Sequence, residues 1–468
     1  MLHSRDFETQ APGETEFRHR YERALARSAQ LRARRTRLRA AAGTAAVACL
    51  VVAGLVTASA MTTTPQRQPV ARSSMHHTTW RLVSDIAGGA SSWRVLSPSD
   101  YEQTFSLVCP GEKTCYADST GGQLEYTHDG GSTWRQATGT VRAVALPQIS
   151  CVDAQACDVL AELAGRGSTL LTTTDGGQTW TSHRGPPLVP NVSQDGPGAD
   201  LPGLGMSCAR ISSCVVVGYA GASSARSRSQ IFRTSDGGVS WSQSTFPPPG
   251  SREFVPSGLS CTGTTCVAVG FFGQWHSESG PGGRAQGVSY LGGAAYTSDD
   301  GGARWSASSA PPVGVSSLSC PGDTDCYALA PSAVFETEDG GQTWDQVKTS
   351  GLPGPSSGWN FISMSCASSS SCWLTGAGTP ASRPANSSAQ RSSSAGHALR
   401  SVSVGQARAL LASTVDSGAS WAVSTAPARV GGVIDVSCPN TSTCFALGAE
   451  QNGSAPGHIK VVLLTNTP

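Results

Sequence analysis

Hydrophobic residues follow two different patterns along the chain. Residues 40–61 (AAAGTAAVACLVVAGLVTASAM) form one uncharged, mostly apolar run, and about 20 such residues are needed to cross a bilayer core. Beyond residue 79, short apolar segments such as VPSGLSC (255–261) and CVAVGFF (266–272) alternate with clusters of Gly, Pro, Ser and Asp, which is typical of strands joined by turns. The pattern therefore predicts one transmembrane helix followed by an all-β domain.

Arginines next to the apolar run predict its orientation. Five of them precede it directly: Arg32, Arg34, Arg35, Arg37 and Arg39. Because such an excess marks the cytoplasmic side of a span, residues 1–39 are interpreted as a basic cytoplasmic arm. Residues 40–61 are then a signal-anchor, 62–78 a linker and 79–468 an extracytoplasmic domain on the cell membrane.

A cleaved leader is the alternative to an anchor. Ala58, Ser59 and Ala60 resemble a signal-peptidase site, and Arg34 with Arg35 resembles a twin-arginine pair. However, the arm is longer than an ordinary signal-peptide n-region, and Arg37 stands where a twin-arginine signal has an apolar residue. We expect an uncleaved anchor, and cleavage after Ala60 remains open.

Composition and charge narrow the class of protein further. The chain has 54 Gly, 28 Pro and only 14% charged residues, which suits many short strands better than packed helices. Of its 33 Lys and Arg, ten lie within residues 1–40, which leaves 23 bases and 27 acids in the rest. A nearly neutral exported domain neutralises few phosphates, so no nucleic-acid partner is expected.

Fourteen of the 15 cysteines form seven local pairs, and Cys49 lies within the predicted span. The pairs are Cys109/Cys115, Cys151/Cys157, Cys208/Cys214, Cys261/Cys266, Cys320/Cys326, Cys366/Cys372 and Cys438/Cys444. Each pair flanks a polar, turn-forming segment, and the compartment outside the cell membrane is oxidising. These two features predict seven disulfides across hairpins. Metal binding would need closer cysteines with histidine partners, so no metal or cofactor is expected.

An octapeptide, [ST]-x-D-x-G-x-x-W, follows six of the seven pairs. The copies are 127–134, 173–180, 234–241, 298–305, 337–344 and 414–421. Their shared acids are Asp129, Asp175, Asp236, Asp300, Asp339 and Asp416, and their shared aromatics are Trp134, Trp180, Trp241, Trp305, Trp344 and Trp421. We expect each Asp to accept bonds from its own turn, each Gly to permit positive φ, and each Trp to fill the gap between sheets.

The octapeptides resemble the Asp box, or bacterial neuraminidase repeat, of a β-propeller family. That family groups sialidases, some glucanases, the sortilin ectodomain and photosystem II assembly factors. The resemblance implies an all-β propeller in which the Asp boxes are structural, so they supply no catalytic residue. Seven cysteine pairs, with first cysteines 42 to 72 residues apart, then predict seven four-stranded blades.

The last blade needs a strand from the other end of the domain. No octapeptide follows Cys444, and the chain ends in HIKVVLLTNTP. Trp93 stands 16 residues before Cys109, within the 15 to 28 residues that separate each octapeptide Trp from the next first Cys. We therefore expect an N-terminal strand at Trp93 to complete the last blade, which would remove the free sheet edges.

Inserts predict where a ligand would bind. They occur at 220–230, 273–289 and 376–404 between second and third strands, and at 181–204 between blades, all on the face opposite the cysteine hairpins. Trp275, His276 and Glu278 are the insert residues best equipped to bind a ligand, as an aromatic platform with an acid/base pair.

The resemblance leaves two functions open. The first is a membrane-tethered extracytoplasmic module that binds or assembles a protein or glycan ligand. The alternative is a glycoside hydrolase, sialidase-like or glucanase-like, which needs paired carboxylates or an arginine cluster. Neither constellation can be assigned in the sequence, so no catalytic residue is named.

Overall fold

The computed structural model describes only part of the chain. The described residues are 79–86, 94–95, 106–119, 123–137, 143–163, 167–187, 205–220, 228–247, 253–280, 283–311, 313–354, 359–378, 408–451 and 458–467. The chain divides into two compact units, Met1–His76 and His77–Pro468, and all described residues belong to the second. The predicted arm, span and linker therefore lie outside them. Within the described residues, no helix is long and apolar enough to cross a bilayer.

Seven antiparallel sheets make up the described unit. The inner strands are β3 (Leu107–Val108), β7 (Ala143–Cys151), β11 (Gly205–Arg210), β15 (Glu253–Thr262), β19 (Ser317–Ser319), β23 (Trp359–Cys366) and β27 (Val430–Ser437). The second strands are β4 (Cys115–Ser119), β8 (Cys157–Leu163), β12 (Ser213–Ala220), β16 (Thr265–Gly280), β20 (Cys326–Ala330), β24 (Cys372–Gly378) and β28 (Phe445–Gln451).

The third strands are β5 (Gln123–Thr127), β9 (Gly167–Thr173), β13 (Arg228–Thr234), β17 (Gly283–Ser298), β21 (Ala333–Thr337), β25 (Arg408–Thr414) and β29 (His458–Thr465). The outer strands are β6 (Arg135–Gln136), β10 (Thr181–Arg184), β14 (Ser242–Ser244), β18 (Ser306–Ala307), β22 (Asp345–Gln346), β26 (Ala422–Ser424) and β1 (Arg81–Asp85). A further strand, β2 (Arg94–Val95), also pairs with β29.

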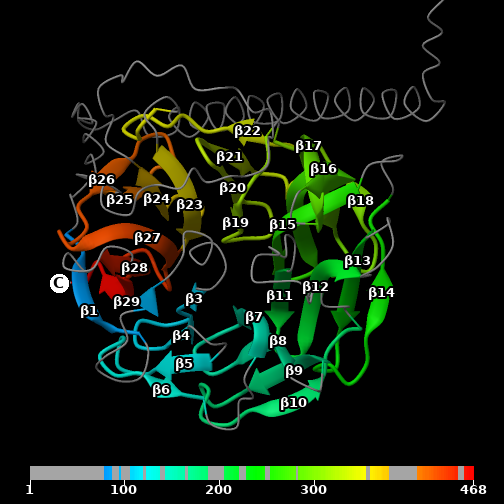
Figure 1. Cartoon of the computed structure of the whole chain (residues 1–468), viewed down its shortest axis with the longest axis horizontal. Helices are drawn as coiled ribbons and strands as arrows, with labels where there is room; N and C mark the ends of the chain where they lie inside the picture. The colour runs from blue at the N-terminus through cyan, green and yellow to red at the C-terminus, as the bar shows by residue number, and fades with distance from the viewer. Residues whose placement is uncertain are drawn as a thin grey trace, which may run out of the picture. The chain divides into compact units, whose positions relative to one another are not determined.

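The seven sheets stand around a common centre with their inner strands towards it (Figure 1). The colours run once around the ring, and the blue strand β1 lies beside the red strand β29. This arrangement is a seven-bladed β-propeller, which confirms the prediction of an all-β domain with seven blades. We number the blades one to seven from the sheet of β3 to the sheet of β27.

Apolar side chains hold neighbouring blades together. The described buried residues form seven clusters, and each cluster spans one interface between two blades. At the third interface, for example, Val217 on β12 packs in the same cluster as Tyr296 on β17. The middle strands are buried on both faces for this reason, and β20 reads CYALA with all five residues buried.

An N-terminal strand closes the ring, as expected, but it begins earlier than the sequence indicated. β1 pairs with β29 from Arg81↔Thr465 to Asp85↔Val462, whereas the segment after Trp93 contributes only the two pairs of β2. The expectation that the strand at Trp93 completes the blade is thus wrong in position. Trp93 itself lies outside the described residues.

Trp80 takes the place that the octapeptide tryptophans hold in other blades. Its ring is 2% exposed and packs edge-on against Trp373 of blade six, with 5.0 Å between ring centroids. Trp80 therefore lies between the sixth and seventh blades, because each such Trp faces the blade before its own.

Blade seven has a turn like those of the octapeptides, and its two halves come from the start and the end of the propeller. The backbone N–H of Thr467 donates to Thr465 Oγ1 at 3.3 Å, as the N–H of Asp175 does to Thr173 Oγ1 at 3.4 Å. Trp80 and Arg81 then take the positions of Trp134 and Arg135, and Arg81 Nε donates to the carbonyl of Thr467 at 2.9 Å. One octapeptide-like turn is therefore shared between residues 80–81 and 465–467.

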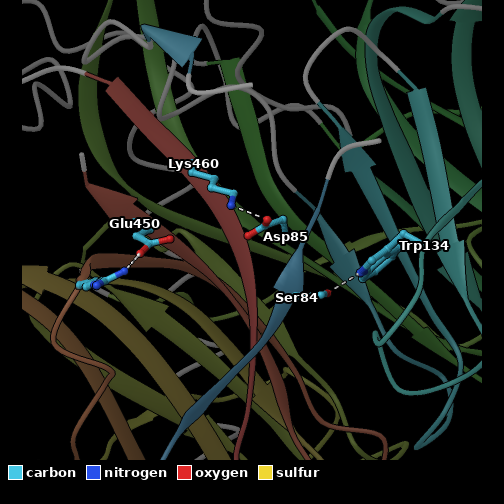
Figure 2. Close-up of polar contacts among 6 residues, drawn as sticks. Ser84, Asp85, Trp134, Glu450 and Lys460 are labelled. Atoms are coloured by element: carbon cyan, nitrogen blue, oxygen red, sulfur yellow. Dashed lines mark hydrogen bonds and ion pairs between the residues drawn. The ribbon is translucent and has the colours of Figure 1, made fainter. Parts of the chain in front are cut away.

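Polar contacts fasten β1 on both of its sides (Figure 2). Lys460 of β29 forms an ion pair with Asp85. Trp134 of blade one donates through Nε1 to Ser84 Oγ at 3.1 Å. β1 is therefore anchored to the last blade and to the first.

All seven predicted disulfides form. Each joins the end of an inner strand to the start of the second strand, with 4.0 to 4.2 Å between the Cα atoms. The disulfide assignment is therefore confirmed for the fourteen paired cysteines, and Cys49 lies outside the described residues.

Candidate functional site

The cysteine hairpins and the octapeptides lie on one face of the ring. In blade one, the N–H of Gly130 in the octapeptide donates to the carbonyl of Lys113 in the cysteine hairpin at 2.9 Å. The equivalent bond occurs in blades two to six. We call this side the cysteine face. The opposite side, the insert face, carries the connections between second and third strands and between successive blades.

The octapeptide aspartates are used within their own turns. Asp175 accepts bonds from the hydroxyl of Thr179 at 2.6 Å, from the N–H of Thr179 at 2.9 Å and from the hydroxyl of Thr173 at 2.8 Å. The Thr179 hydroxyl and N–H lower the pKa of Asp175 to about 2, because they favour the ionised form. A carboxylate bound in this way holds a turn and has little capacity left for a ligand.

The octapeptides also seal each blade against the blade before it. Gly177, at φ 89°, lies so close to Tyr116 of blade one that a Cβ would stand 2.9 Å from its ring. Only glycine combines this φ with this approach. Trp241 Nε1 of blade three donates to the carbonyl of Arg184 in blade two at 2.9 Å. The cysteine face is therefore occupied by contacts that build the ring.

Serine hydroxyls join neighbouring inner strands at the centre of the ring. The N–H of Cys208 in blade three donates to Ser150 Oγ in blade two at 2.9 Å. The same bond links Cys261 to Ser207, Cys366 to Ser319, Cys438 to Ser365 and Cys109 to Ser437. A Ser directly precedes the first Cys in six of the seven pairs, and Val108 is the exception. This signal was visible in the sequence and was missed.

Asp435 is the carboxylate of this central ring. Its oxygens accept bonds from the N–H of Leu107 in blade one at 2.8 Å, from Ser363 Oγ in blade six at 2.6 Å and from the N–H of Val436 at 2.9 Å. Burial raises the pKa of Asp435 above its usual range. Asp435 thus connects three blades at the point where the ring closes, and each of its two oxygens accepts at least one hydrogen bond.

Charged residues are sparse on the inner strands. Along the described inner strands, acids occur only at Glu253 and Asp435, and a base only at Arg210. Glycoside hydrolysis needs two carboxyl groups about 5 to 9.5 Å apart around the sugar. The described centre of the ring therefore offers hydroxyls and backbone groups more than acid/base pairs.

The predicted ligand-binding residues lie on an extended hairpin of blade four. β16 and β17 pair continuously from Cys266↔Ser298 to Gly280↔Gly283. The expectation of an irregular insert at 273–289 is therefore wrong, since this segment continues the two middle strands of the blade. We call Gln274–Gly280 with Gly283–Ser289 the ribbon. It projects on the insert face because the connection between second and third strands lies there.

The register separates the three predicted residues. Position 275 pairs with Val288, position 276 with Gly287 and position 278 with Ala285. Because successive residues of a strand alternate between faces, His276 and Glu278 share one face of the ribbon and Trp275 belongs to the other. The predicted acid/base pair, His276 with Glu278, is compatible with this placement, and the predicted aromatic platform at position 275 belongs to the other face of the ribbon.

The greater parts of the inserts at 181–204, 220–230 and 376–404 lie outside the described residues. Within the described part, one grouping has metal-ligand chemistry, Asp158 with Cys208 and Cys214, but both sulfurs belong to a disulfide. Asp158 accepts a bond from Thr172 Oγ1 at 2.6 Å instead, and burial raises its pKa.

Comparison with known proteins identifies other propellers. No family model matches the chain, and no curated protein matches it. Among solved structures, YCF48 bound to D1 peptide is 15% identical with a TM-score of 0.48, covering 84% of this chain and 96% of that one. YCF48 from Cyanidioschyzon merolae gives 13% and 0.46, covering 83% and 98%.

A GH74 xyloglucanase from Xanthomonas campestris is 13% identical with a TM-score of 0.47, covering 82% of this chain and 55% of that one. At these identities and TM-scores, the likenesses do not bear on function. The strand topology of the chain itself defines the propeller.

Proposed function

We propose that this chain is a membrane-tethered extracytoplasmic binding or assembly module that presents its insert face to a protein or glycan ligand. The ribbon carries this proposal. It extends the middle strands of blade four to 16 residues each, whereas the second strands elsewhere have five to eight. A long, regular element on a rigid scaffold is suited to recognition.

The cysteine face is the less suitable binding surface. Its aspartates, glycines and tryptophans are engaged in turns or packed against the preceding blade. The insert face carries the ribbon and the three other inserts. The contrast supports a ring with one structural side and one ligand-binding side.

The octapeptides are, in this proposal, Asp boxes. Their support comes from the six-fold recurrence of one pattern, in which the first Thr or Ser donates to Oδ1 of the Asp two residues later at 2.7 to 2.9 Å. This role is structural. It is compatible with either an assembly module or an enzyme, so the octapeptides do not decide the activity.

Residues 40–61 are proposed as the anchor, with the propeller outside the cell membrane. β1 occupies the outer position of blade seven, and outer strands begin on the cysteine face after each octapeptide. A tag before Arg5 should be protected from protease in intact cells while a tag after Pro468 is cut. Release of a soluble chain that begins near Met61 would contradict the anchor.

The alternative function, hydrolysis of an extracellular glycan, needs two free carboxyl groups near the ring centre. The described inner strands provide Glu253 and Asp435, and the oxygens of Asp435 are occupied by donors from three blades. These observations favour the binding module. Cleavage of sialosides or β-glucans by the purified full chain would reverse this preference.

Photo-crosslinking tests the proposed binding face. A photoreactive phenylalanine replaces Trp275 or His276 on the ribbon, or Asp323 in the exposed cysteine hairpin of blade five, in the full chain expressed in its own cells. Adducts are expected from the two ribbon positions and not from Asp323. Adducts from Asp323 alone, or from none of the three, would overturn the proposal.

A further inference from the structure

Within the described residues, the strands that flank the two middle strands of blade four do not extend along the ribbon. β15 pairs with β16 as far as Glu253↔Gly273, and β18 pairs with β17 only at Tyr296 and Thr297. From Gln274 to Gly280, β16 pairs with β17 on one side. No strand in the described part of the chain pairs with its other side, which we call the β16 edge.

An edge of this kind has a defined chemistry. Alternate residues of a strand turn their N–H and C=O groups towards each side, so the β16 edge offers a row of backbone donors and acceptors. Only an extended polypeptide backbone matches such a row along its length. The β16 edge also continues the line of β15, so an added strand would extend a hydrogen-bond ladder that the blade already has.

A partner strand would stabilise the ribbon, because the ribbon has only two strands. Two-stranded hairpins are marginally stable in water, and a third strand or a packed face is needed to stabilise them. The ribbon contains three glycines, Gly280, Gly283 and Gly287, and glycine is unfavourable within strands. A third strand would therefore order this segment on binding.

We propose that the ribbon binds an extended segment of a partner protein by strand addition at the β16 edge. This inference rests on the proposed function and specifies its ligand as a peptide segment. The added strand runs antiparallel to β16, as β15 does. Its backbone provides the affinity, and its alternate side chains provide the selectivity.

The residues at the edge specify the peptide further. Glu278 belongs to a ribbon face that has no Lys or Arg, whereas Trp275 belongs to the opposite face with Val288. Directly opposed residues of antiparallel strands share a face. A peptide residue opposite Glu278 is therefore expected to be basic, and the residue three positions later, opposite Trp275, is expected to be apolar.

Selection from a random peptide library tests this inference. Phage-displayed 12-residue peptides are panned against the full chain in detergent micelles. Enriched peptides should contain a Lys or Arg followed three residues later by an apolar residue, with no Pro between them. Absence of any enriched peptide, or enrichment of unrelated sequences, would overturn strand addition at this edge.

Two variants locate the binding and define its mode. Replacement of residues 274–289 by Asn-Gly joins the paired residues Gly273 and Tyr290 by a two-residue turn, and it should abolish binding while the melting temperature of the ring stays unchanged. The matched Glu278→Ala variant keeps the backbone edge, so it should still bind peptides but lose the preference for the basic residue. Equal binding by the trimmed and parent chains would contradict the proposal.

Methylation of peptide nitrogens separates backbone pairing from side-chain recognition. N-methyl groups at every second residue of a selected peptide should weaken binding by at least about tenfold in one of the two alternations and by much less in the other. Equal effects in both alternations would contradict strand pairing. If photo-crosslinks form on the insert face but outside the ribbon, the binding function stands and this inference fails.

Discussion

Trp80 belongs to the octapeptide-like turn of blade seven, which is divided between the start and the end of the propeller. It is fully buried against Trp373, while its turn is completed by Thr465 and Thr467. Truncation of a large buried aromatic costs about 3 to 5 kcal/mol. Trp80→Ala should therefore lower the free energy of unfolding in urea by this amount.

Trp241→Ala is the matched control for Trp80→Ala. Trp241 is only half-buried, so its truncation should cost clearly less. The same urea titration checks both variants. If Trp80→Ala is no more destabilising than Trp241→Ala, Trp80 is not the tryptophan of the seventh blade.

Asp435 is a second residue whose role depends on the closed ring. It stands three residues before Cys438, where blades five and six have Ser317 and Ser363. Asp435→Leu leaves donors from two other blades without an acceptor, which should cost about 2 to 4 kcal/mol. Asp435→Ser supplies a hydroxyl like that of Ser317, so the urea midpoint should stay close to that of the parent.

The pH dependence of stability should differ between Asp435→Ser and the parent chain. Because the folded-state pKa of Asp435 is raised, its ionised form costs stability at neutral pH, and this cost is relieved as pH falls through that pKa towards about 3.9. The stability of Asp435→Ser relative to the parent should therefore decline between pH 7 and pH 4. A difference that stays constant with pH would show that the carboxylate is not buried in this way.

The sequence predicted residues whose partners are local and missed those whose partners are in another blade. Cys208 meets Cys214 across one hairpin, and Asp175 meets Thr179 within one turn, so spacing alone identified them. Trp80 was missed because the rest of its turn lies at Thr465. Ser150 and Asp435 were missed because their bonds cross between blades, and such bonds have no fixed spacing in the sequence.

At the scale of elements, the octapeptide turn is a repeated acid-sensitive unit. The pKa values of Asp175 and Asp236 are lowered to about 2 by their turn hydroxyls and amides. Groups with a lowered folded-state pKa contribute stability above the unfolded value of about 3.9, and this contribution is lost as pH falls through the folded value. The melting temperature should therefore fall between pH 4 and pH 2.

Asp175→Ala isolates the contribution of one turn. The variant should melt below the parent at pH 7. The gap between the two melting temperatures should narrow towards pH 2, which is below the unfolded pKa of Asp175 and close to its folded-state pKa of about 2. Thermal unfolding followed by circular dichroism at each pH checks this. A gap that is unchanged at pH 2 would mean that the ionised carboxylate does not hold the turn.

The ribbon is a pair of strands that the sequence did not predict. Its Gly- and Ser-rich sequence, QWHSESGPGG, has few β-branched residues and therefore suggested a loop. The structure pairs it as strands because it continues β16 and β17, whose buried parts fix the register. The Pro-Gly dipeptide at 281–282 was the available signal in the sequence, since such dipeptides mark turns between strands.

For the whole molecule, ring closure determines both faces of the propeller. The insert face is continuous only if blade seven joins blade one, and the octapeptide seals are complete only if β1 presents Ser84 to Trp134. β1 achieves this by joining residues near the start of the domain to the last strand of the chain. The seven blades are thus expected to unfold together rather than separately.

The most direct measurement compares two N-terminal truncations of the exported unit, one beginning at His77 and one at Ala87. The first retains β1 and should unfold in a single thermal transition. The second lacks β1 and Trp80, so β29 becomes an exposed edge. Its melting temperature should fall by several degrees, with faster hydrogen exchange in β28 and β29. A truncation at Ala87 that melts and exchanges like the one at His77 would contradict closure of the ring by β1.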